Sequence, residues 1–218
     1  DLASVLLLPS LTASAFFHDE LPRDLQSDLQ VTLRQAEAWA EADYAAALMK
    51  GDRLEAEELE AVGAQLARYT GLDPVFVIGT NLRISADGFA RQLLGEQDLE
   101  LGHYGAHLTR KVTNPGESYD LWTDPSLFSN GTSGLIVPYL RSELGFFADA
   151  RYAGPWGGGW PSPTTPRADW TGRNWNQGST NANVNVNLDL ADAMRRNPTL
   201  RVFVAHGYFD LVTPYYAG

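Results

Sequence analysis

The feature that most constrains the fold of this chain is a long segment, residues 154–185, that is poorly suited to helix or strand. It reads GPWGGGWPSPTTPRADWTGRNWNQGSTNANVN. Glycine, proline, serine and asparagine dominate it, and these residues favour turns over regular secondary structure. The sequence therefore predicts three regions: residues 1–150, a connecting loop at residues 151–180, and residues 181–218.

The spacing of apolar residues predicts helices before this loop. From residue 25 to residue 48 the apolar positions keep largely to helical spacing, and Gly51 supplies a stop. A second run, residues 59–69, ends at Gly71. Capping residues and local patterns predict three further short helices, after Asp73–Pro74, after Ser85 and within residues 132–145.

A helix followed by a strand is predicted after the loop. The segment NLDLADAMRRNP has Asn187 as a candidate N-cap and Asn197–Pro198 as a stop. The next segment, TLRVFVAHG at residues 199–207, is almost continuously apolar, which is typical of a buried strand in a parallel sheet. Asp210 would then lie in the loop at the carboxyl end of that strand, where α/β sheets build their sites.

Composition excludes several classes of function. The formal net charge of -11 makes nucleic-acid binding unfavourable, because an acidic surface repels phosphate. The absence of cysteine excludes disulfides, thiolate zinc sites and a cysteine nucleophile, and it leaves the cellular compartment open. No apolar run is long enough to span a membrane. The sequence starts within an apolar stretch and stops in a loop, so we expect an internal fragment of a longer protein.

Three segments resemble the serine carboxypeptidase family, in the order in which they occur there. LRVFVAHGYFDLVTPYYA strongly resembles the strand and loop that carry the family's catalytic aspartate, with Gly-x-x-Asp followed shortly by proline. LLLPSLTASAFFHDEL is similar to the start of the helical insertion in the bacterial branch. NVNLDLADAMRRNPTLRV is similar to the helix that leads into the aspartate's strand. The resemblance covers most of the chain, and the segment around Asp210 is its most specific part.

The resemblance implies an α/β fold, namely part of an α/β-hydrolase with a large, mainly helical cap insertion. Residues 1–150 would be the cap, and residues 181–218 would return to the hydrolase core. Members cleave C-terminal peptide bonds with a Ser-Asp-His triad, in which Asp210 would be the aspartate that orients the histidine. A peptide is the implied substrate, and neither a cofactor nor a metal is implied.

The other two members of the triad are expected outside these 218 residues. No histidine follows Asp210, and His206 is interpreted as a strand residue that cannot reach the same site. The resemblance places the serine upstream of Asp1. The chain alone is therefore predicted to be inactive, with a second copy or the remainder of the hydrolase domain as its protein partner.

Ser118 is a candidate nucleophile that the surrounding residues argue against. It lies in Gly-Glu-Ser-Tyr, which matches the family's nucleophile motif. However, Asp120 stands where the turn needs a small residue, and Asn114–Pro115 would interrupt the preceding strand. Pro125 would also break the helix that should follow. We interpret Ser118 as a chance match, and an intact hydrolase that uses it is the least favoured alternative.

Two other patterns in the sequence concern the binding of a metal ion or of a ligand. His103 and His107 have a spacing that suits two metal ligands on a helix, but Gly102 and Gly105 argue against a helix there, and no third ligand is evident. The second pattern is the set of tryptophans in the loop, which could instead make the chain a helical module that binds peptide or glycan. That set comprises Trp156, Trp160, Trp170 and Trp175.

Overall fold

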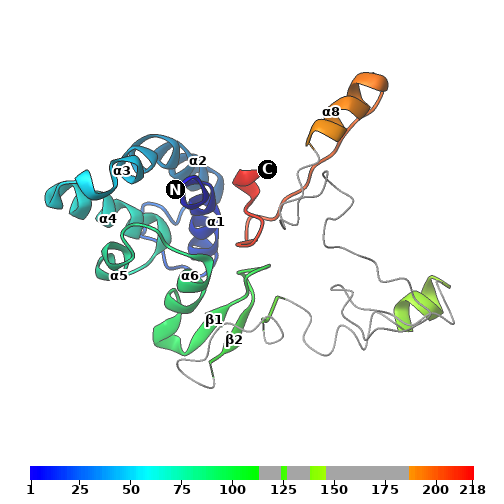
Figure 1. Ribbon diagram of the computed structural model, residues 1–218. Coiled ribbons are helices and arrows are strands. Elements are labelled where there is room, and N and C mark those ends of the chain that lie inside the picture. The colour runs from blue at the N-terminus through cyan, green and yellow to red at the C-terminus, as the bar shows by residue number, and fades with distance from the viewer. Residues whose placement is uncertain (113–123, 127–137, 146–186) are drawn as a thin grey trace, which may run out of the picture. The chain divides into compact units, whose positions relative to one another are not determined.

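The computed structural model describes residues 1–112, 124–126, 138–145 and 187–218 (Figure 1). The chain divides into two units, one formed by Asp1–Asn130 with Ala205–Gly218 and the other by Gly131–Val204. Ser118 and the four loop tryptophans lie outside the described residues, so the expectations for them stay predictions.

The first unit is built around α1 (Leu2–Phe17), which lies in the region predicted as the helical cap, although the spacing of apolar residues did not predict this particular helix. Every residue from Leu8 to Ala15 is buried, so this part of the helix is buried on all sides. Two of its three buried hydroxyls, those of Thr12 and Ser14, donate to carbonyls one turn earlier, at 3.1 Å and 2.8 Å, whereas the Ser10 hydroxyl has no hydrogen-bond partner among the described residues. A helix buried on all sides lacks the amphipathic spacing that usually reveals helices in a sequence.

The long helix predicted from residue 25 is confirmed with a later start. Asp28 caps α2 (Leu29–Trp39), accepting a hydrogen bond from the Val31 amide at 3.1 Å. The helix continues through a π-helical segment, η1 (Ala40–Tyr44), into α3 (Ala45–Lys50). Gly51 ends α3 with a positive φ of 54° and begins the 3₁₀ turn η2 (Gly51–Arg53).

The next three predicted helices are also confirmed. α4 (Ala56–Thr70) ends at Gly71, which adopts the left-handed conformation. Asp73 caps α5 (Pro74–Gly79), and Ser85 caps α6 (Ala86–Gln92) through a 3.0 Å bond from the Gly88 amide. After the 3₁₀ turn η3 (Gly95–Gln97), strands β1 (Leu99–Leu101) and β2 (Thr109–Lys111) pair antiparallel, with Leu99 opposite Lys111.

Residues 205–218 complete the first unit. Leu211 is buried in its core, and the segment ends in a 3₁₀ turn, η6 (Tyr215–Ala217). Figure 1 shows this C-terminal segment, drawn in red, beside α1 and α2.

The second unit is described over two stretches. One is a short π-helical segment, η5 (Tyr139–Glu143), which lies within the predicted helix at residues 132–145. The other contains α8 (Asn187–Arg196), which confirms the helix predicted before Asn197–Pro198.

The predicted α/β fold is wrong for the described residues, which are mostly helical and whose sheet has only two antiparallel strands. The apolar run at residues 200–204 forms no strand, and Phe203 is 91% exposed. A strand exists only where a neighbour takes up its backbone hydrogen bonds, and in the described part of the chain none pairs with this run. Apolar sequence indicates suitability for burial, but it does not supply the partner strand.

Candidate functional site

Asp210 lies in a tight turn that its own carboxylate stabilises. Its Oδ1 accepts hydrogen bonds from the backbone amides of Val212 and Thr213, both at 2.8 Å. Its Oδ2 accepts a third from the hydroxyl of Thr213. This pattern is typical of aspartate at the start of a turn, and it fixes the orientation of the carboxylate. We call residues 207–213 the Asp210 loop.

The carboxylate of Asp210 keeps some capacity for another donor. An ionised carboxylate offers about four acceptor positions, and the described residues fill three of them. Because Oδ2 takes only the Thr213 hydroxyl among the described residues, it can accept one more hydrogen bond. Asp210 is half-buried, so a donor can approach from outside the chain. Such a carboxylate can orient an imidazole.

The loop that contains His103 and Ala106 holds the Asp210 loop from one side. The Ala106 amide donates to the carbonyl of Phe209, and the Leu211 amide donates to the carbonyl of His103, each at 2.8 Å. These bonds fix the backbone immediately before and after Asp210. The buried side chain of Leu211 anchors the same position in the core.

A buried His103–Asp124–Ser126 cluster supports that loop. Asp124 Oδ2 accepts from the His103 amide at 2.8 Å and lies 3.1 Å from His103 Nδ1. Asp124 Oδ1 accepts from the amide and the hydroxyl of Ser126, and Ser126 Oγ accepts from the Tyr104 amide at 2.9 Å. His103 and Asp124 are only 5% and 2% exposed. The sequence analysis missed this cluster, because its members meet only in the folded chain.

The electrostatics of this cluster follow from its hydrogen bonds. Burial would raise the pKa of Asp124, but the bonds from His103 and Ser126 outweigh burial and hold that pKa well below its usual range. The pKa of Tyr104 is raised, first by burial and then by the carboxylates of Asp124 and Asp210. The aspartate stands between the histidine and the serine, whereas serine activation needs the histidine in the middle. The cluster is therefore structural.

The histidines of the first unit occupy separate environments. Residues 102–108 are not helical, as the glycines predicted, and His103 is buried beside Asp124. His107 instead packs against the rings of Phe17 and Phe209, at centroid distances of 5.9 Å and 5.3 Å. Among the described residues, no group of three potential ligands is placed to hold a metal ion.

The prediction that His206 lies on a strand is wrong, because residues 199–207 form no strand. It is exposed, and its ring lies against Gly218, where an added Cβ would come within 2.4 Å of Nε2. Val212 and Thr213, rather than His206, provide the described hydrogen bonds to the carboxylate of Asp210.

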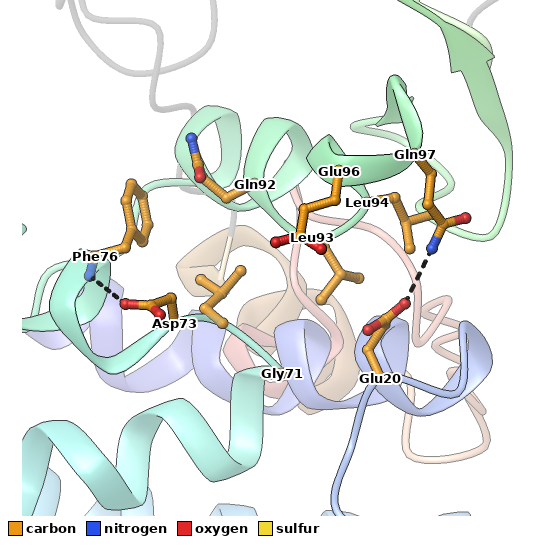
Figure 2. Close-up of a pocket in the computed structure, with 10 residues that line it drawn as sticks. Glu20, Gly71, Asp73, Phe76, Gln92, Leu93, Leu94, Glu96 and Gln97 are labelled. Atoms are coloured by element: carbon orange, nitrogen blue, oxygen red, sulfur yellow. Dashed lines mark hydrogen bonds between the residues drawn. The ribbon is translucent and has the colours of Figure 1, made fainter.

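A separate pocket of about 250 Å³ opens near the ends of α1, α4 and α6 (Figure 2). Gln97 donates to Glu20 across it at 3.3 Å. Its charged side chains are all carboxylates, so it favours a cationic group over an anionic one. The lining residues do not include the Asp210 loop; they are Glu20, Gly71, Leu72, Asp73, Phe76, Gln92, Leu93, Leu94, Glu96 and Gln97.

Comparison with protein-family models, with curated proteins and with solved structures found no match to this chain. The function therefore has to be argued from the residues themselves. Within the described part of the chain, no helix combines the length and the apolar character needed to cross a bilayer.

Proposed function

We propose that this chain is part of a serine-type carboxypeptidase, in which Asp210 orients the catalytic histidine. One observation supports this most directly: the carboxylate of Asp210 is fixed by three hydrogen bonds and retains one acceptor position on Oδ2. The sequence pattern around Asp210 supports it as well. The support comes from this local arrangement and not from the overall fold.

The proposed role of Asp210 follows from the chemistry of acyl transfer. A serine attacks the peptide carbonyl, and a histidine accepts the serine's proton. The carboxylate of Asp210 accepts the other imidazole N–H, which fixes the tautomer and stabilises the imidazolium that forms. The serine and the histidine come from outside these 218 residues in this proposal, so the chain alone does not hydrolyse peptides.

A fluorophosphonate probe, which reacts with activated serines, tests the proposal. We expect no labelling of this chain, and labelling of the longer product when the flanking coding sequence is included. In that longer product, Asp210→Asn should lower the turnover of a C-terminal peptide bond by a factor on the order of ten thousand. Asparagine keeps the Oδ1 acceptor, so the turn itself should persist.

Asp73→Asn is the matched control. Asp73 Oδ1 accepts from the amides of Val75 and Phe76, two and three residues later, as Asp210 Oδ1 does from its own turn. This variant should retain full turnover. Labelling of Ser118 in the isolated chain would overturn the proposal and favour an intact hydrolase. Failure of both products to label would favour the binding-module alternative.

A further inference from the structure

We propose that Glu37 and Glu41 are positioning residues for Asp210. They hold the segment that follows it by accepting hydrogen bonds from two consecutive tyrosines. The catalytic meaning of this inference rests on the proposed function, but the mechanical link between these residues does not.

The two tyrosines bind successive carboxylates. The Tyr215 hydroxyl donates to Glu37 Oε1 at 2.7 Å, and the Tyr216 hydroxyl donates to Glu41 Oε1. Burial and then the bond to Glu37 raise the pKa of Tyr215, and the bond to Glu41 followed by burial raises the pKa of Tyr216 to about 12. Both hydroxyls therefore remain protonated donors around neutral pH.

A third contact lies on the other side of Asp210. Gln30 Nε2 donates to the hydroxyl of Tyr208 at 3.0 Å, and the rings of Tyr208 and Tyr215 meet edge to face at 4.9 Å. Residues 30, 37 and 41 are seven and four positions apart, so they lie on one face of the α2–η1 helix. One helix face therefore holds the chain both before and after Asp210.

Glu41 lies within the π-helical segment of this helix, which is a rare geometry that is frequent at functional sites. The buried ring of Tyr44 stacks on Trp39, and its hydroxyl donates to the Leu82 carbonyl at 2.6 Å. These contacts hold the π-helical segment against the core. The carboxylate of Glu41 therefore extends from a segment that is anchored to the core.

Asp210 has little regular secondary structure around it, and η6 is the nearest such element that follows it. Its position depends on the bonds to His103 and Ala106 on one side and on the tyrosine contacts on the other. A catalytic carboxylate has to be held within about 0.5 Å of its working position. A displacement of about 1 Å can cost a hundredfold in rate.

The first test uses the 218-residue chain with Glu37→Ala and Glu41→Ala combined. Hydrogen exchange of peptides covering residues 207–217 should accelerate at least tenfold, and the ¹³Cγ chemical shift of Asp210 should change. Glu37→Gln with Glu41→Gln keeps an acceptor oxygen at both positions and should largely restore both readouts. Glu58→Ala, which removes a surface ion pair with Lys50, should leave both unchanged. Unchanged exchange in the double alanine variant would overturn the inference.

The second test measures probe labelling in the longer product. At a temperature well below the melting temperatures of all the variants, the double alanine variant should label at least tenfold more slowly than wild type, and the double glutamine variant should recover most of the rate. An unlabelled wild type would defeat the proposed function, while the exchange test would still decide whether these carboxylates hold the Asp210 loop. A labelled wild type whose rate the alanine variant leaves unchanged would overturn the positioning role.

Discussion

Tyr215 donates a 2.7 Å hydrogen bond to Glu37, a residue 178 positions earlier in the chain. Both side chains are partly buried, so this bond is shielded from water on at least one side. It connects the second helix of the first unit to the last turn described. The bond therefore forms only when residues 205–218 are packed against the helices of the first unit.

Removal of this hydroxyl should destabilise the first unit. We expect Tyr215→Phe to lower the free energy of unfolding by about 1.5–3 kcal/mol, because the acceptor is charged. Urea denaturation followed by circular dichroism measures this loss. Tyr139 is exposed, so Tyr139→Phe should change stability by less than about 0.5 kcal/mol. Equal stabilities of the two variants would show that the Tyr215–Glu37 bond contributes nothing.

Asp124 should make the stability of the chain depend on acid pH. Its pKa is lowered in the folded state, so the unfolded state binds more protons as the pH falls. The stabilisation is fully present above the unfolded pKa of about 3.9 and is lost as the pH falls through the lower, folded pKa. Unfolding free energies measured between pH 6 and pH 3 should decline more steeply for wild type than for Asp124→Asn.

The same variant should cost about 2 kcal/mol at pH 7, where the wild-type carboxylate is ionised and hydrogen-bonded. Asp52 is exposed, so Asp52→Asn should keep the wild-type pH profile. Parallel profiles for wild type and Asp124→Asn would mean that the pKa of Asp124 is not lowered by folding.

Gly102 should be intolerant of a side chain. An added Cβ would lie 2.6 Å from both Cβ and Oγ of Ser126 and 3.0 Å from the Gly105 carbonyl oxygen. Gly102→Ala should therefore displace Ser126 and destabilise the fold by about 1–3 kcal/mol, measured by thermal or urea unfolding. Gly95 has open space at the corresponding position, so Gly95→Ala should be tolerated. A stable Gly102→Ala variant would contradict the close packing of this loop.

The central helix should be the most sensitive part of the first unit. Leu8 is 1% exposed, so Leu8→Ala should lower the free energy of unfolding by about 2–5 kcal/mol. Leu2, at the start of the same helix, is 68% exposed, and Leu2→Ala should cost less than about 0.5 kcal/mol. Calorimetric melting of the two variants measures the difference. Similar costs at both positions would contradict the central position of α1.

Local signals in the sequence predicted local structure well. Asp73 and Ser85 cap helices, and Gly71 ends one, because a few neighbouring backbone bonds decide these features. The spacing of apolar residues did not predict α1, because burial on all sides removes the helical periodicity of apolar and polar positions. The strand at residues 200–204 was predicted wrongly, since a strand depends on a partner that the run itself cannot specify.

In the candidate site too, the local feature could be predicted from the sequence and the tertiary contacts could not. The turn at Asp210 was foreseeable from an aspartate followed by Thr213 and Pro214. The contacts that hold this turn in place could not be predicted, because His103 and Glu37 are distant from it in sequence and come near it only in the tertiary fold. The pocket beside Glu20 was missed for the same reason, since its walls come from elements that are far apart in the chain.

The packing of α1 against η6 has a consequence for biosynthesis. Residues 2–17 are synthesised about 200 positions before residues 215–217, yet their burial against η6 is completed only when those later residues arrive. The nascent polypeptide therefore exposes part of an unusually apolar helix while the residues between α1 and η6 are translated. Because transiently exposed apolar surface promotes aggregation, the docking of η6 is the step that ends this exposure.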